Sequence, residues 1–438
     1  MTDRLAASFF LVAMAMLAFT SGAFVVLDRS YPHEFLSTAY RAGVAWVEKK
    51  TQYLDPLATD LWRAARRPQR GVTIHDANGV YVGYTLHTSG DGAHARLVAM
   101  DGTLVHEWRR PFSTVWNEGA AVKQPQPDEL IYFDNARLLP SGELIAIYTA
   151  AGDTPWGYGM VKLDPEGEVI WSYLQQTHHD FDIAGDGRIY VLTHEVTNEP
   201  IAEHDRLERP RLDDFVVILS PDGEELKKVS LTHALLRSRY KDLLHAVPIF
   251  ALGDPLHTNT VELIDDAKAA NFAHGEPGQV LLSFRDAGLV AVLDVDSETI
   301  VWATRGPWLG QHSPTILPNG NILLFDNFGV PEEGNASQVI ELDPRSMAVV
   351  WRYTGDSGHP LDSAIRSAVQ PLPNGNALIT ESDGGRLLEI NRDGQIVWEY
   401  INPARGGENE ELIPVVSGGR RIAANWLSPA FQATLPSP

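Results

Sequence analysis

The feature that most constrains the fold is a repeated unit of two short apolar segments around a polar turn. Five copies reach a tryptophan at or near their end: LVAMDGTLVHEW, VKLDPEGEVIWSY, AVLDVDSETIVW, IELDPRSMAVVWRY and LEINRDGQIVWEY. A sixth copy, VVILSPDGEELKKV, has Lys228 near the tryptophan position. Apolar segments joined by Asp-Gly-type turns predict antiparallel hairpins.

A second hairpin precedes most of these units and turns at Gly142, Gly187, Gly320 and Gly375. Two hairpins supply four strands, and a four-stranded unit recurring about every 45 to 50 residues is typical of a propeller blade. The six copies therefore predict an all-β fold, a six-bladed β-propeller over residues 71–430. We expect the tryptophans to wedge between neighbouring blades.

The N-terminus differs from the rest of the chain. Residues 5–27 carry no charge and are long enough to cross a bilayer as a helix, so residues 1–28 predict a transmembrane anchor or uncleaved signal. A cleavable signal peptide is the alternative, because AFTSGA supplies small residues. Residues 29–70 have helix-compatible apolar spacing from Phe35 to Trp62 and predict a helical linker.

Charge and composition exclude several functions. The net charge of −22 argues against a nucleic-acid partner, since phosphate backbones bind basic surfaces. The absence of cysteine excludes disulfides, thiolate catalysis and cysteine-ligated zinc. An anionic small substrate would need local Arg and His side chains.

The repeat register places histidines at one position of the blades. Eight residues before the turn glycine lie His179 and His312, and the same offset gives Asp134 and Ser367. These positions begin the innermost strands, so we expect their side chains to meet at one mouth of the central channel. The register alone selects His179 over its neighbour His178.

A third blade adds His257, with Asn259 on the same strand face, and Arg285 seven residues past the turn at Gly278. The same offset past the other turns gives His194 and Asn327. Converging cations in an acidic protein favour an anion site. A transition metal bound by the histidines with Asp180 or Asp182 is the alternative, although Arg285 beside a divalent cation is unfavourable, and we expect no metal.

At these residues the sequence resembles the bacterial arylsulfate sulfotransferases. The resemblance is carried by HTNTV at 257–261, SFRD at 283–286, HHDFD at 178–182 and the stretch QHSPTILPNGNILLFDN that contains His312. It implies a six-bladed propeller enzyme that moves a sulfuryl group from an aryl sulfate to a phenol without phosphoadenosine phosphosulfate or another cofactor.

The resemblance also implies residue roles. His312 would be the nucleophile, His257, Asn259 and Arg285 would hold the sulfate oxygens, and His179 would assist at the phenol oxygen. Known members begin with a β-rich domain and some have a disulfide, whereas this chain begins with an apolar segment and has no cysteine. We expect a single-pass protein of the inner membrane with its propeller in the periplasm.

Two other functions remain open from sequence. One is a membrane-anchored, non-catalytic propeller that acts as a scaffold or binding module, with the insertion 234–256 as a possible docking helix for a protein partner, although a helix that caps its own propeller is the competing interpretation. The other is a quinoprotein-like dehydrogenase with a cofactor over the channel.

Overall fold

The computed structural model describes residues 2–28, 30–33, 55–153, 155–329 and 337–436. It divides into two units, Met1–Ala58 and Thr59–Pro438. The second unit contains six sheets of four or five antiparallel strands, so the predicted six-bladed β-propeller is confirmed.

In every blade the first strand named below lies innermost, and the following strands lie progressively outward. Blade 1 is β27 (Val416–Ile422), β3 (Tyr84–Ser89), β4 (His94–Val98) and β5 (Leu104–Arg109); blade 2 is β6 (Ile131–Leu138), β7 (Leu144–Ala150), β8 (Gly157–Leu163) and β9 (Val169–Tyr173). Blade 3 is β10 (Thr177–Ile183), β11 (Ile189–Thr197), β12 (Arg211–Leu219) and β13 (Glu225–Ser230); blade 4 is β14 (Thr258–Leu263), β15 (Val280–Phe284), β16 (Leu289–Asp294) and β17 (Thr299–Arg305). Blade 5 is β18 (His312–Ile316), β19 (Ile322–Asp326), β20 (Gln338–Asp343) and β21 (Ala348–Tyr353); blade 6 is β22 (Ala368–Pro371), β23 (Ala377–Glu381), β24 (Arg386–Ile390) and β25 (Ile396–Ile401), with β2 (Gly71–His75) as an added outer strand.

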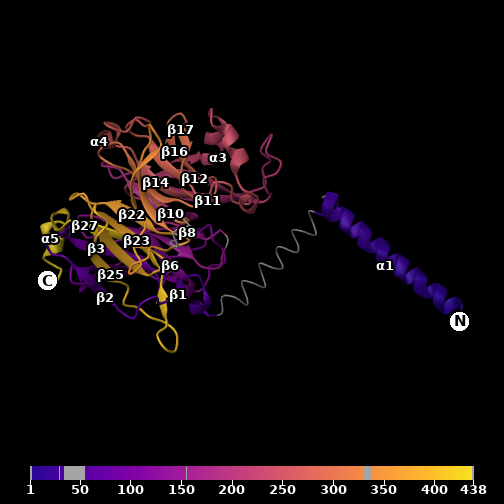
Figure 1. Ribbon diagram of the computed structural model, residues 1–438, viewed down its shortest axis with the longest axis horizontal. Coiled ribbons are helices and arrows are strands. Elements are labelled where there is room, and N and C mark those ends of the chain that lie inside the picture. The colour runs from indigo at the N-terminus through magenta and orange to yellow at the C-terminus, as the bar shows by residue number, and fades with distance from the viewer. Residues whose placement is uncertain (1, 29, 34–54, 154, 330–336, 437–438) are drawn as a thin grey trace. The chain divides into compact units, whose positions relative to one another are not determined.

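The ring is closed by strands from opposite ends of the propeller sequence. The yellow strand β27 lies beside the indigo strand β3 (Figure 1), and their register runs from Val416 opposite Ser89 to Ile422 opposite Tyr84. A further small sheet joins β1 (Trp62–Ala64) to β26 (Leu412–Pro414). β2 pairs in the same way with β25, so three pairings between early and late segments tie the blades at the junction by backbone hydrogen bonds.

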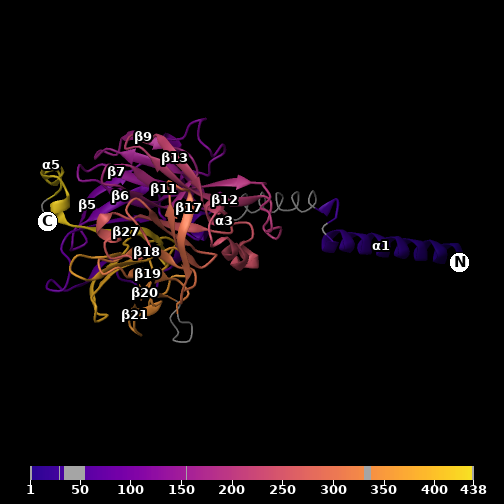
Figure 2. The ribbon, with the colours of Figure 1, turned by 90° about the horizontal axis from the view of Figure 1, so that it is seen from above.

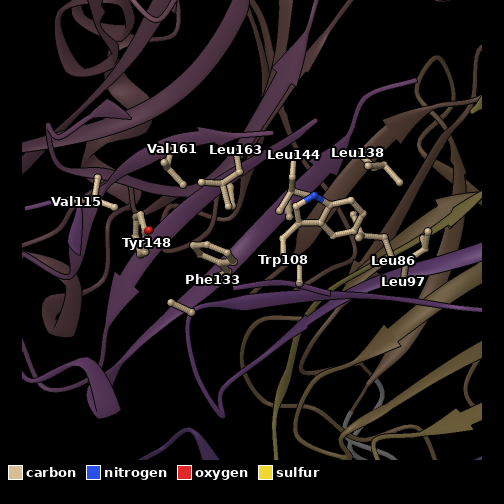
Figure 3. Close-up of a cluster of buried hydrophobic side chains, with 14 of the residues drawn as sticks. Leu86, Leu97, Trp108, Val115, Phe133, Leu138, Leu144, Tyr148, Val161 and Leu163 are labelled. Carbon is tan, nitrogen blue, oxygen red and sulfur yellow. The ribbon is translucent and has the colours of Figure 1, made fainter. Parts of the chain in front are cut away.

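The tryptophans link adjacent blades. Trp108 is fully buried in the apolar cluster that joins blades 1 and 2, together with Phe133 and Tyr148 (Figure 3). Its indole Nε1 donates a hydrogen bond to the Gly142 carbonyl at 3.2 Å, in the first turn of blade 2. Trp171, Trp351 and Trp398 also donate to carbonyls of the following blades, but in the turns between the two outer strands: those of Pro221, Arg392 and Met100. Each indole therefore adds one directed bond to the apolar packing between blades.

Helices are few among the described residues. They are α1 (Thr2–Asp28), α3 (Leu231–Leu236), α4 (Asp266–Ala269) and α5 (Pro429–Gln432), with 3-10 turns η1 (Pro56–Ala58), η2 (Phe112–Thr114), η3 (Asp128–Leu130), η4 (Lys241–Ala246), η5 (Ile249–Ala251) and η7 (Ala424–Trp426). Within α1, Ala6–Asp28 is long and apolar enough to cross a membrane, and a signal sequence would pass the same test.

The predicted helical linker over residues 29–70 can be compared with the structure only in part, because residues 29 and 34–54 lie outside the described residues. Where the chain is described again, it forms the turn η1 and then strand β1, so Trp62 is in a strand and the helix predicted to reach it was wrong there. The pairing of β1 with β26 satisfies the backbone hydrogen-bonding groups of residues 62–64. The apolar spacing of the local sequence does not indicate this long-range pairing.

The insertion 234–256 covers its own propeller. Helix α3 lies against β12 and β17 (Figure 2), and Leu235 and Leu244 are fully buried in the core shared by blades 3 and 4. The apolar face that was predicted as a possible docking surface for a protein partner is thus used within the chain, and the capping interpretation fits instead.

Candidate active site

The innermost strands carry backbone irregularities at the same end of the blades. Register shifts follow Phe133, Thr177, Thr258, His312 and Val416, one in each of blades 2, 3, 4, 5 and 1. At this end the backbone is left-handed at His179, His257, Ser313, Arg366 and Ser367. Bulges of this kind re-aim side chains next to functional sites, and in this channel they turn polar side chains toward the propeller axis.

A cavity of about 310 Å³ lies among the six innermost strands, and every blade contributes to it. Its wall includes the residues Gly418, Asp134, His179, Asn259, His312 and Ser367, from blades 1 to 6 in turn. The predicted residues His179, Asn259 and His312 therefore share one cavity. The other predicted residues do not line it: His178, His194, His257, Arg285 and Asn327.

His312 is held in one tautomer. Its Nδ1 lies 2.9 Å from the Gly310 carbonyl and 2.6 Å from Oδ1 of Asn327. The amide nitrogen of Asn327 donates to the Ser363 and Arg366 carbonyls at 2.8 and 2.9 Å, which directs its oxygen toward His312. Since Nδ1 faces two acceptors, it carries the hydrogen, and Nε2 keeps its lone pair.

The electrostatic surroundings keep His312 neutral. The side chain is buried, and burial together with the charge of Arg285 lowers the pKa of His312 to about 3. At neutral pH the ring is therefore an uncharged imidazole with a lone pair at Nε2. Within the described part of the chain, no hydrogen bond engages that nitrogen.

His179 and His257 lie side by side, with ring centroids 5.3 Å apart, and the Trp156 ring lies 5.4 Å from that of His257. Burial and the neighbouring histidines hold the pKa of His179 well below its usual value. Burial opposes a charge on His257, but Asp254, whose Oδ2 lies 2.6 Å from Nδ1, outweighs it and raises the pKa. The pair thus combines a neutral imidazole with one that favours its cationic form.

Arg285 does not line the cavity. Its backbone NH donates to the His257 carbonyl at 3.2 Å, and its guanidinium pairs with Asp286 at 2.6 Å. Arg285 was predicted to crowd the channel mouth; it lies near enough to act on His257 and His312, but the adjacent carboxylate holds its side chain away from the cavity wall. Its charge still acts on His312, whose pKa it lowers.

Asn259 bridges two blades at the cavity. Its amide donates to the Gln311 carbonyl at 2.8 Å, immediately before His312. This bond fixes the start of β18 against β14. Asn259 is buried, and its side chain lines the cavity beside His312.

His178 and His194 are nearly fully buried, and their rings stack at 4.4 Å. Neither lines the cavity. Nδ1 of His178 lies 2.7 Å from Nδ1 of His179, so the two adjacent histidines are joined through their rings. The register count correctly assigned His179, rather than His178, to the channel.

The carboxylates of the channel tie the blades together. Asp180 pairs with Arg137 at 3.0 Å and accepts the Val261 backbone NH at 3.3 Å, and Asp182 accepts that of Leu263 at 2.9 Å. These bonds satisfy edge-strand NH groups of the next blade. Asp180 and Asp182, considered from sequence as metal partners, are thus engaged in holding β14.

Sequence reasoning missed four cationic side chains of the cavity. They are Arg137, Lys268, Arg366 and Arg420. Burial, with Arg137 nearby, lowers the pKa of Arg420 to about 10. Burial raises the pKa of Asp134 to about 6, although Arg366 opposes the rise. Arg366 directly precedes Ser367, the residue at the register position of its blade. This adjacency is the one sequence signal that could have identified Arg366.

The fold and this cavity define a six-bladed propeller with histidines and cations around a polar axial pocket. The sequence profile of the arylsulfotransferase (ASST) family matches residues 135–403, more than half of the chain. The chain belongs to this family. Family membership supports aryl sulfuryl transfer as the general reaction.

Other comparisons concern the fold. No curated protein matches the chain. A protein of unknown function from Bacteroides caccae is similar with 13% identity and a TM-score of 0.48, covering 76% of this chain and 99% of its own. Virginiamycin B lyase from Staphylococcus aureus shows 10% identity and a TM-score of 0.35, covering 61% and 69%, and a streptogramin B lyase shows 11% and 0.41, covering 82% and 95%.

Proposed function

We propose that the protein transfers a sulfuryl group from an aryl sulfate to a phenolic acceptor through a sulfohistidine at His312, without phosphoadenosine phosphosulfate. The observation that carries this proposal is the tautomer of His312. Its Nδ1 hydrogen is committed to Gly310 and Asn327, so a lone pair at Nε2 belongs to a residue that lines the axial cavity. A neutral imidazole is a competent nucleophile near pH 7.

The first step forms a bond between Nε2 and the donor sulfur while the bond from sulfur to the aryl oxygen breaks. The leaving group departs as a phenolate and gains a proton from solvent or a neighbouring donor. The imidazole becomes positively charged, and the Nδ1 hydrogen bonds to Gly310 and Asn327 strengthen as this charge develops.

The second step reverses the roles. The acceptor phenol loses its proton, its oxygen attacks sulfur, and the bond from sulfur to Nε2 breaks to restore neutral His312. An imidazole whose environment disfavours positive charge, as the low pKa of His312 indicates, is a good leaving group in this step. One site can therefore serve donor and acceptor in turn.

The sulfuryl oxygens need donors around the transferring group. Asn259 lines the cavity beside His312, and the ring of His257, whose pKa Asp254 raises, lies 5.3 Å from that of His179. Arg285 would contribute after its side chain turns from Asp286, a single-residue rearrangement. His179, which lines the same cavity, is the candidate partner of the phenol oxygen. Fixed donors of this kind stabilise the transferring group, as in phosphoryl transfer.

The direct test is mass spectrometry of the protein after exposure to 4-nitrophenyl sulfate. We expect the peptide containing His312 to gain the mass of one SO₃ group and to lose it when phenol is added. A modified peptide elsewhere, with His312 unchanged, would contradict the proposal.

Replacing Asn327 with alanine tests the tautomer argument. The bond to Nδ1 stabilises a developing charge, and such bonds contribute roughly 1.5–3 kcal/mol, so kcat should fall about 10- to 100-fold. KM for the donor should change little, because Asn327 lies behind the ring. Steady-state kinetics measure both constants, and circular dichroism verifies the fold. An unchanged kcat in a folded variant would remove Asn327 from the mechanism.

We propose further that α1 anchors the protein once in the inner membrane with the propeller in the periplasm. The chain has no cysteine, so a single Asp222→Cys substitution in the exposed turn between β12 and β13 gives a clean probe. A membrane-impermeant maleimide should label this variant in spheroplasts before lysis. Labelling only after lysis would place the propeller in the cytoplasm, and recovery of the protein in the soluble fraction would indicate a cleaved signal.

A further inference from the structure

Blade 3 contains a buried cluster of two histidines and one aspartate outside the axial cavity. His178, His194 and Asp214 come from the neighbouring strands β10, β11 and β12, and all three are at most 2% exposed. His194 and Asp214 are direct cross-strand partners, and the bulge in β10 brings His178 over His194. One ligand atom from each residue lies within 4.8 Å of the others.

The cluster leaves buried polar atoms without partners. Nε2 of His178 and both ring nitrogens of His194 make no hydrogen bond to any described residue. The closest carboxylate oxygen, Oδ1 of Asp214, lies 3.7 Å from Nε2 of His178, which is too far for a hydrogen bond. Buried polar groups in proteins are nearly always satisfied, so three such nitrogens in one place require an explanation.

The other contacts of the cluster direct these atoms toward one another. Oδ2 of Asp214 accepts the Thr258 backbone NH at 2.7 Å, which leaves Oδ1 for a ligand. Nδ1 of His178 lies 2.7 Å from His179, which leaves Nε2. A direct His–Asp hydrogen bond could satisfy one histidine nitrogen at most, whereas one cation could bind an atom of all three residues.

We propose that His178, His194 and Asp214 bind a divalent transition metal ion of the zinc type. Two imidazoles and one carboxylate are a common ligand set for such ions, whereas Mg²⁺ and Ca²⁺ prefer oxygen ligands. This site differs from the one considered from sequence, which used Asp180 and Asp182, and it departs from the expectation of no metal. It does not depend on the proposed sulfuryl transfer.

The metal would also orient a histidine of the channel. When Nε2 of His178 binds the ion, the neutral ring carries its hydrogen on Nδ1 and donates it to Nδ1 of His179. The hydrogen of His179 is then on Nε2. The ion therefore makes Nε2 of this cavity-lining histidine a hydrogen-bond donor, and His178 is a positioning residue for it.

The test uses the full-length chain, purified in detergent without a polyhistidine tag and treated with a chelator. Titration with Zn²⁺ by calorimetry should show one high-affinity site per chain, and Co²⁺ should give visible absorption bands typical of nitrogen and oxygen ligands. His194→Ala should weaken Zn²⁺ binding about 100-fold or more, because even the outer-shell partners of metal ligands contribute 10- to 100-fold.

Two further variants make the result decisive. Asp214→Asn preserves the shape of the side chain but removes its charge, so this variant should also weaken Zn²⁺ binding. It serves as the test if His194→Ala fails to fold. His245→Ala is the matched control, because exposed His245 stacks on buried His204 at 4.3 Å in a second histidine pair away from the cluster, and it should bind Zn²⁺ as the wild type does. Absence of Zn²⁺ binding by the wild type, or wild-type affinity in folded Asp214→Asn, would overturn the proposal.

Discussion

Replacing His312 with alanine is expected to lower kcat for sulfuryl transfer by at least about 10⁴-fold, as the loss of other covalent nucleophiles does. The variant lacks the Nε2 atom that would bond to sulfur, and the other cavity-lining histidine, His179, is bonded to His178 through its Nδ1. Release of 4-nitrophenolate from 4-nitrophenyl sulfate, followed by absorbance with phenol as acceptor, measures the rate.

A second variant separates loss of chemistry from loss of structure. His312→Asn retains an amide donor that can reach the acceptors on Gly310 and Asn327, so the mouth of the channel should keep its fold while transfer is lost. His245→Ala, at the surface, should retain full activity. Transfer at the wild-type rate by folded His312→Asn would exclude this residue as the nucleophile.

The blades could be predicted from sequence because each hairpin is local. A turn glycine, two apolar strands and a terminal tryptophan recur in blades whose strands follow one another in the chain. The closure could not be predicted this way. β27 reads VSGGRRI, without apolar alternation, and its partner β3 lies at the opposite end of the propeller sequence. Non-local pairing leaves no signal in a local pattern.

The same reasoning applies to the site. A fixed offset from each turn placed His179 and His312 at one end of the inner strands, and both line the cavity with Asn259. The offset fixes the backbone position but not the direction of a long side chain. Arg285 turns to the neighbouring Asp286, and Arg366, a residue of the cavity wall that was not predicted, pairs with Asp60 at 2.6 Å.

The strongest single test of the ring closure is Trp398→Ala, which should lower the free energy of unfolding by about 3–5 kcal/mol, as expected for a fully buried tryptophan. The indole is fully buried and stacks on Tyr400 with centroids 5.9 Å apart. Its Nε1 donates to the Met100 carbonyl of blade 1 at 2.9 Å, and the Arg421 guanidinium lies 4.6 Å over the ring. Removing it opens a cavity between the first and last blades.

Trp351→Ala is the matched comparison, because this indole makes the same kind of bond, to Arg392 at 2.9 Å, but is partly exposed and lies between blades 5 and 6. Its loss should cost only about 1–2 kcal/mol, since less apolar area returns to water. Denaturant-induced unfolding followed by fluorescence measures both variants. If the two substitutions cost the same, the stability of the propeller does not depend specially on the side-chain packing where its ends meet. The ring would then be held closed by the strand pairings of β27 with β3, β1 with β26 and β2 with β25.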